Sequence, residues 1–348
     1  MVLWICLNYS FSFYANSQDL KLSGLHEIGK NFSTYIKNND GWKRESWGEL
    51  KDLIFLKKTN TFGEQAFKLK VGASILGLSF DDQSRSYRSI HLIEGILKIS
   101  VSTTKENIAG TQIETLRMGD VLILSPGASL VHLENGSNSQ SQFDYTFSFP
   151  IIPKLSTAAD YKIKHPRDQQ EIRFKVNLEG PVQIAKTLVN GDEVSQAFSR
   201  VEFVIGKKER GPSFHTHATF ETFRIPHNSP GSLEVSIGGD GKREIKLMSG
   251  DIANISPEVS HSYRNLSAEH EVKLIATFAP AGLEKMFIGF HETYRQYLAD
   301  RKRTKNEAEI LELNRSYPTK LNAVRQIQFN HIDGLRSPAK GAWKVSSP

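Results

Sequence analysis

The feature that most constrains the fold is an internal duplication. The segment MGDVLILSPGASLVHLENGS at 118–137 aligns without gaps on SGDIANISPEVSHSYRNLSA at 249–268. Upstream of each copy, ILKISV at 96–101 resembles SLEVSI at 232–237. A unit that occurs twice in one chain predicts two tandem domains of the same fold. The 348 residues are enough for two such domains of about 150 residues each.

Both copies lie in regions that have the pattern of short β-strands. Runs of β-branched and aromatic residues, such as FKLKV, VLILSPG and FDYTFSF, alternate with Gly, Asn, Asp and Ser. This even spacing of short strands and turn residues is typical of all-β barrels and sandwiches. The pattern restarts after a connector at about 150–167. We therefore predict an all-β protein with one barrel at 50–150 and a second at 151–280.

The period of the apolar residues changes after Pro280. Apolar residues then recur at helical spacing, as in AGLEKMFIGFHETYRQYLADRK, and a shorter helix is expected around Glu307–Leu313. We predict a helical C-terminal extension at 281–348. Its aromatic stripe is expected to cover a barrel or the seam between the barrels.

Residues 1–49 are predicted to form an N-terminal arm. Residues 1–17 are apolar and end in Ala15-Asn16-Ser17, a pattern that a signal peptidase cuts, but no Lys or Arg precedes the apolar core. Secretion is therefore one alternative, and a cytoplasmic location is favoured. The single cysteine, Cys6, excludes an intrachain disulfide and a cysteine-based zinc site.

Composition excludes two classes of partner. The net charge of +6 is spread along the chain apart from RKRTK at 301–305, a pattern that favours a solvated helix end over nucleic-acid binding. The sequence contains no run of 18 apolar residues, so we expect no membrane span. The expected partner is a small-molecule substrate, and a homodimer is compatible with the sequence.

The residues with the clearest chemical signal lie in the second copy. On a strand, His215 and His217 would point to one face, and Glu221 would follow on the next strand. His261 comes from a separate strand after the Gly250-Asp251 turn. Three imidazoles and one carboxylate suit Fe(II), Mn, Ni, Cu or Zn.

These residues form the two-part signature HxHxxxE and Gly-Asp…His…Asn, the latter completed by Asn265. In this, the sequence resembles the cupin superfamily, and the duplication identifies it as similar to bicupins. The resemblance implies two tandem double-stranded β-helix (jelly-roll) barrels. It also implies one divalent metal bound by His215, His217, Glu221 and His261, with Fe(II) favoured.

The sequence departs from the signature at several positions. Glu258 stands where the second motif commonly has Gly, and Glu209 stands at an expected Gly, with Gly211 nearby. In the N-terminal copy the ligand positions are expected to fall on Asp82, Ser84, Arg88 and Leu130, so this barrel is predicted to have lost its metal site. His91 and His132 lie out of register and are expected to be structural.

Among bicupins, the sequence is similar to quercetin 2,3-dioxygenase-like proteins through TFAPAGLEKMFIGF at 277–290 and EILELNRSYPTKL at 309–321. This resemblance implies a metal-dependent oxygenase that acts on a small enolisable or phenolic, flavonol-like substrate. Glu221 would be the catalytic base and O₂ the second substrate. The alternatives are a metal-dependent isomerase or cyclase without O₂ chemistry, and a ligand-binding bicupin without catalysis.

Overall fold

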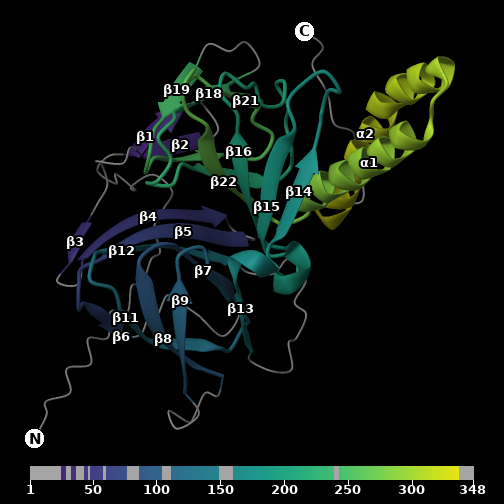
Figure 1. Ribbon diagram of the computed structural model, residues 1–348. Coiled ribbons are helices and arrows are strands. Elements are labelled where there is room, and N and C mark those ends of the chain that lie inside the picture. Colours follow the sequence, from purple (N-terminus) through teal and green to yellow (C-terminus); the bar gives the residue numbers. More distant parts are fainter. Residues whose placement is uncertain are drawn as a thin grey trace, which may run out of the picture.

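The computed structural model describes residues 25–28, 33–36, 43–45, 48–57, 60–76, 86–103, 111–148, 160–238 and 243–336. Figure 1 shows two β-rich units, one above the other, with two helices beside the C-terminal unit. The all-β prediction with helices after residue 280 is therefore confirmed. The signal-peptide hypothesis for residues 1–17 concerns a segment outside the described residues.

The N-terminal unit consists of two antiparallel sheets. Its strands are β3 Lys43–Glu45, β4 Gly48–Lys57, β5 Asn60–Leu69, β6 Ser74–Leu76, β7 Tyr87–Glu94, β8 Ile96–Ser102, β9 Gln112–Arg117, β10 Val121–Leu124, β11 Ser129–Asn135, β12 Ser141–Ser148 and β13 Tyr161–Lys164. One sheet has the order β13-β10-β7-β12-β5-β4-β3, and the other has the order β6-β11-β8-β9. Apolar side chains such as Leu92, Leu122 and Phe143 fill the space between them.

The C-terminal unit repeats this arrangement. Its strands are β1 Leu25–Ile28, β2 Ser33–Ile36, β14 Gln170–Phe174, β15 Gln183–Val189, β16 Ser199–Ile205, β17 Phe220–Arg224, β18 Leu233–Ile237, β19 Arg243–Leu247, β20 Ile252–Ile255, β21 His261–Asn265 and β22 Val272–Ala279. The sheet orders are β1-β2-β20-β17-β22-β16-β15-β14 and β19-β18-β21. Two short 3₁₀ turns lie at Pro166–Asp168 and Gly191–Val194.

Two strands pair with a unit other than the segment to which the sequence assigned them. β2, from the segment predicted as an arm, pairs with β20 of the C-terminal unit. β13, which lies after residue 150, pairs with β10 of the N-terminal unit. The sequence-based domain limits of 50–150 and 151–280 stay a prediction.

Matching hydrogen bonds identify structurally equivalent residues in the two copies. Nδ2 of Asn135 and of Asn265 each lies within hydrogen-bond distance of three backbone carbonyl oxygens, which share its two N–H groups, and each Oδ1 accepts a bond from the amide two residues later. These two asparagines are one position out of step in the gapless alignment. The cause is a register shift in β11 between Leu130 and His132, where one extra residue is accommodated as a bulge.

A buried ionic cluster joins the two units. Asp144 on β12 contacts Arg200 Nη2 at 3.1 Å and Arg224 Nε at 2.7 Å, and Arg200 Nη2 also donates to Glu64 at 3.0 Å. All four side chains are at most 2% exposed. Thr222 donates to the second oxygen of Glu64. Strand β17 is therefore anchored at the seam by its outward-facing residues.

Two helices follow the last strand, α1 Leu283–Arg303 and α2 Glu307–Arg336. The fully buried Glu284 fixes the start of α1 because its carboxylate accepts bonds from the amides of Gly191 and Gly282. The prediction of a short helix at Glu307–Leu313 was wrong, since α2 continues through Pro318. Burial of the neighbouring Tyr317 and Leu321 against the C-terminal unit favours the longer helix.

Candidate metal centre

Three separate segments bring together the four residues of the predicted ligand set. His215 and His217 lie in the segment between β16 and β17, Glu221 is the second residue of β17, and His261 begins β21. The strand expected through His215 and His217 is reduced to a single bridge, in which the backbones of His215 and His261 exchange two hydrogen bonds. One potential ligand atom from each of the four residues lies within 4.8 Å of all the others.

Backbone carbonyls orient the imidazoles. Nδ1 of His215 lies 3.0 Å from the Ser213 carbonyl oxygen, and Nδ1 of His261 lies 2.9 Å from that of Val259. A carbonyl only accepts, so both Nδ1 atoms donate, and in a neutral ring Nε2 then carries a lone pair. His217 Nδ1 contacts the carbonyl and hydroxyl oxygens of Thr219. These contacts leave the Nε2 atoms for the interior of the site.

The contacts between Glu221 and two imidazoles require a proton or a metal cation at the centre of the site. Glu221 Oε2 lies 2.9 Å from Nε2 of both His217 and His261. In neutral His261 that nitrogen is an acceptor facing a second acceptor, an arrangement that only a proton or a metal cation between the two can stabilise. Burial alone would raise the pKa of Glu221, but its contacts with the two imidazoles outweigh burial and lower that pKa to about 2.

The neighbouring imidazoles favour the neutral state of His215. Burial lowers the pKa of His215 well below its ordinary value, and the nearby His261 and His217 lower it further. A neutral imidazole is the form that binds metals. The donor set also fits a divalent ion, because two ligands held at about 2.1 Å and at right angles lie about 3 Å apart. The 2.9 Å contacts of Glu221 match that spacing.

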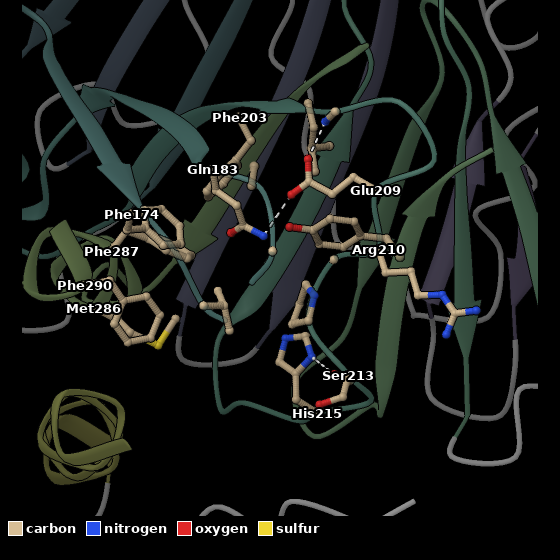
Figure 2. A pocket seen from close by; sticks show the side chains of 18 of the residues that line it. Phe174, Gln183, Phe203, Glu209, Arg210, Ser213, His215, Met286, Phe287 and Phe290 are labelled. Carbon is tan, nitrogen blue, oxygen red and sulfur yellow. Dashed lines mark hydrogen bonds between the residues drawn. The ribbon is translucent and has the colours of Figure 1, made fainter. Parts of the chain in front are cut away.

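Three of the four residues, His215, His217 and Glu221, line a cavity of about 740 Å³, and the fully buried His261 lies behind them. Figure 2 shows Phe174, Phe287, Phe290 and Met286 gathered on one side of it, with His215 on another. Helix α1 supplies three of these side chains to the cavity wall. The prediction that its aromatic stripe packs over a barrel is confirmed, and the same stripe also lines the site.

Sequence reasoning missed several cavity residues. Tyr263 lies two positions after His261 on β21, and this alternation could have identified it as inward-facing. Burial raises the pKa of Tyr263, and the carboxylates of Glu221 and Glu209 raise it further, so its hydroxyl remains a donor. Arg325 of α2 also lines the cavity, but its distance along the chain gave no signal.

The phenylalanines that flank the predicted site in sequence have different positions. Phe223 lines the cavity, whereas Phe220 packs at the seam between the units. Glu221 and Phe223 thus point inward from β17, and Thr222 and Arg224 point to the seam. The same short strand connects the ionic cluster to the candidate metal centre.

The N-terminal unit has different residues at the equivalent positions. Arg88 pairs with Phe147 as Glu221 pairs with Phe278, and Leu130 faces Val101 as His261 faces Ile237. Arg88 is buried and donates to the carbonyls of Ser125 and Ala128. A cation and an aliphatic side chain at these two positions cannot ligate a metal. Asp82 and Ser84, the other two expected positions, lie outside the described residues.

No protein-family model matches the sequence, and no curated protein matches it. Similarity to solved structures is extensive, however. An oxalate decarboxylase from Lactobacillus farciminis superposes with a TM-score of 0.53 at 12% identity, covering 73% of this chain and 88% of that chain. Protein Ylba from E. coli gives 0.52 at 14% identity, covering 76% and 97%.

A structure of Bacillus subtilis oxalate decarboxylase, whose title describes Mn(II) centres, gives 0.50 at 11% identity and covers 73% and 79%. These neighbours are cupin proteins. The fold of this chain is therefore that of a bicupin, two jelly-roll barrels in tandem with a C-terminal helical segment. In the part of the chain that the structure describes, no helix is long and apolar enough to cross a membrane.

Proposed function

We propose that this chain is a metal-dependent cupin oxygenase acting on a small enolisable or phenolic, flavonol-like substrate. The observation that carries the proposal is the four-residue cluster, three members of which line a cavity whose other walls are mainly aromatic and aliphatic side chains. Such walls favour a substrate with apolar surface.

The cluster would supply the metal for this chemistry. A divalent ion bound by His215, His217, Glu221 and His261 would raise the acidity of a substrate hydroxyl and, if redox-active, permit reaction with O₂. Fe(II) is our first choice on ligand type. The Mn(II) centres of the Bacillus subtilis oxalate decarboxylase make Mn(II) the second.

Glu221 would act as the base. Its Oε2 atom contacts the two imidazoles, and among the described residues Oε1 has no hydrogen-bond partner. The carboxylate is ionised at neutral pH, and a pKa of about 2 makes it a weak base, so it could accept a proton only from a substrate hydroxyl whose acidity the bound metal raises. The Tyr263 hydroxyl, held protonated, would donate a hydrogen bond to an oxygen of the substrate. The apolar walls would exclude water from the resulting enolate.

Oxygen uptake tests the proposal. Metal-loaded protein would be screened with flavonols, β-diketones and simple phenols, and at least one of them should drive O₂ consumption. Glu221→Gln should lower the rate by about a hundredfold or more, the scale of general-base catalysis. The exposed Glu269→Gln is the matched control and should leave the rate unchanged. Product formation without O₂ uptake would contradict the oxygenase and favour the isomerase or cyclase.

A further inference from the structure

We propose that the cavity beside the metal centre binds an organic carboxylate, with the apolar body among the phenylalanines and the carboxylate held by Arg325. This inference rests on the proposed function in that it places the substrate in the same cavity. It goes further by assigning a charged group to the substrate and a specificity-determining role to a residue outside the barrels.

Arg325 is positioned as a recognition group. It projects from α2 into the cavity wall, where its guanidinium lies 5.3 Å from the centre of the Phe290 ring. Nη1 donates to Asn322 at 2.8 Å. Among the residues that the structure describes, no carboxylate forms an ion pair with Arg325. Four of its five N–H groups therefore remain for a ligand.

The position of Arg325 makes an anionic partner favourable. Burial lowers the pKa of Arg325, so the protein has placed this cation where water compensates its charge poorly. A carboxylate bound by two parallel N–H bonds would restore that compensation and fix the ligand in one orientation. Stacking on Phe290 holds the guanidinium plane, which lowers the entropy lost on binding.

The other charged groups on the cavity wall are engaged elsewhere or turned away. Figure 2 shows the Arg210 side chain extending away from the cavity, and Lys207 and Lys208 are exposed. The Glu209 carboxylate accepts bonds from the Gly206 amide at 2.5 Å and from Gln183 at 3.1 Å. Arg325 is thus the half-buried cation that faces the cavity among the described residues.

Direct titration of matched probes tests the inference. Metal-free protein, prepared by dialysis against EDTA, would be titrated calorimetrically with 2-naphthoate, its uncharged isostere 2-naphthamide and the cation 2-naphthylmethylammonium. We expect naphthoate to bind at least tenfold more tightly than the amide and the cation to bind most weakly. Arg325→Gln should abolish the tenfold preference. Arg315→Gln, an exposed position on the same helix, should retain it.

Three results would overturn the inference. Equal binding of acid and amide to the wild-type protein would exclude a carboxylate site, and this comparison needs no variant. Retention of the preference in folded Arg325→Gln, checked by circular dichroism, would assign the recognition elsewhere. A preference that appears only after metal is added would identify the probe as a metal ligand. Since no arm requires metal or turnover, failure of the oxygenase proposal and failure of this one are distinguishable.

Discussion

The ionic cluster between the two barrels allows a strong prediction about Asp144→Asn. Asp144 is fully buried and balances Arg200 at 3.1 Å and Arg224 at 2.7 Å. The substitution preserves size but leaves two buried guanidinium groups with Glu64 as their remaining carboxylate partner in the cluster. A single ion pair near 4 Å is worth about 4 kcal/mol before desolvation at an effective dielectric constant of about 20.

We expect a net loss of about 3–5 kcal/mol in the free energy of unfolding, the range measured when one partner of a buried pair is removed. Urea unfolding followed by circular dichroism measures it. Asp192→Asn is the matched control, because Asp192 pairs with Lys285 at 2.9 Å but is 65% exposed. It should cost less than about 1 kcal/mol. A loss below 1 kcal/mol in Asp144→Asn would refute the stabilising role of the cluster.

Three further predictions concern separate parts of the molecule. Glu258 has a φ of 64°, so Glu258→Gly should raise the free energy of unfolding by about 0.5–1 kcal/mol in urea titrations, and a loss would contradict local strain. Glu284→Gln should destabilise the chain by about 1–3 kcal/mol, because Gln replaces one of the two oxygens that accept from the amides of Gly191 and Gly282 with an NH₂ donor; unchanged thermal melting would exclude this contact. Burial lowers the pKa of His91 well below 6.5, and Arg200 and Arg224 lower it further, so the unfolded chain protonates first as the pH falls. Stability should therefore drop between pH 7 and 5.5 by up to about 1.4 kcal/mol per pH unit for this group, and His91→Gln should show a flatter slope.

The positions of the metal-centre residues could be predicted from sequence because the signal is local. HxHxxxE and the Gly-Asp turn preceding His261 are short motifs, and the duplication supplied an internal comparison. The structure gives the physical reason for one departure. Glu258 adopts the left-handed conformation that its counterpart Gly127 adopts with a φ of 88°, so the turn is kept without the glycine.

Other features depend on contacts between residues far apart in the sequence. After the bulge that follows Leu130, the gapless alignment pairs residues that are one position away from their structural counterparts. No local sequence pattern identifies the inserted residue. The pairing of β2 with β20 and the approach of Arg325 to the cavity arise from tertiary packing. The second helix was expected around Glu307–Leu313, but it continues through Pro318 because burial of Tyr317 and Leu321 outweighs the hydrogen bond lost at the proline.

Gly211 matters to the cavity because its missing side chain leaves room for the ring of Tyr263. A Cβ atom there would lie 2.4 Å from the Tyr263 ring, so any larger residue would displace the tyrosine that lines the cavity. In the sequence, Gly211 lies two residues after Glu209, the position where a glycine was expected, and no local pattern explained why residue 211 is a glycine. The reason is visible only once β21 and the segment before His215 are side by side.

The central claim is that the C-terminal barrel holds a single metal ion on His215, His217, Glu221 and His261. Metal analysis by mass spectrometry of protein reconstituted with Fe(II) and freed of excess ion tests it most directly. We predict one ion per chain in the wild-type protein and a loss of most of that ion in His261→Ala, with His132→Ala as the control that retains it. A wild-type protein without stoichiometric metal, or a His261→Ala variant that keeps its ion, would contradict the account.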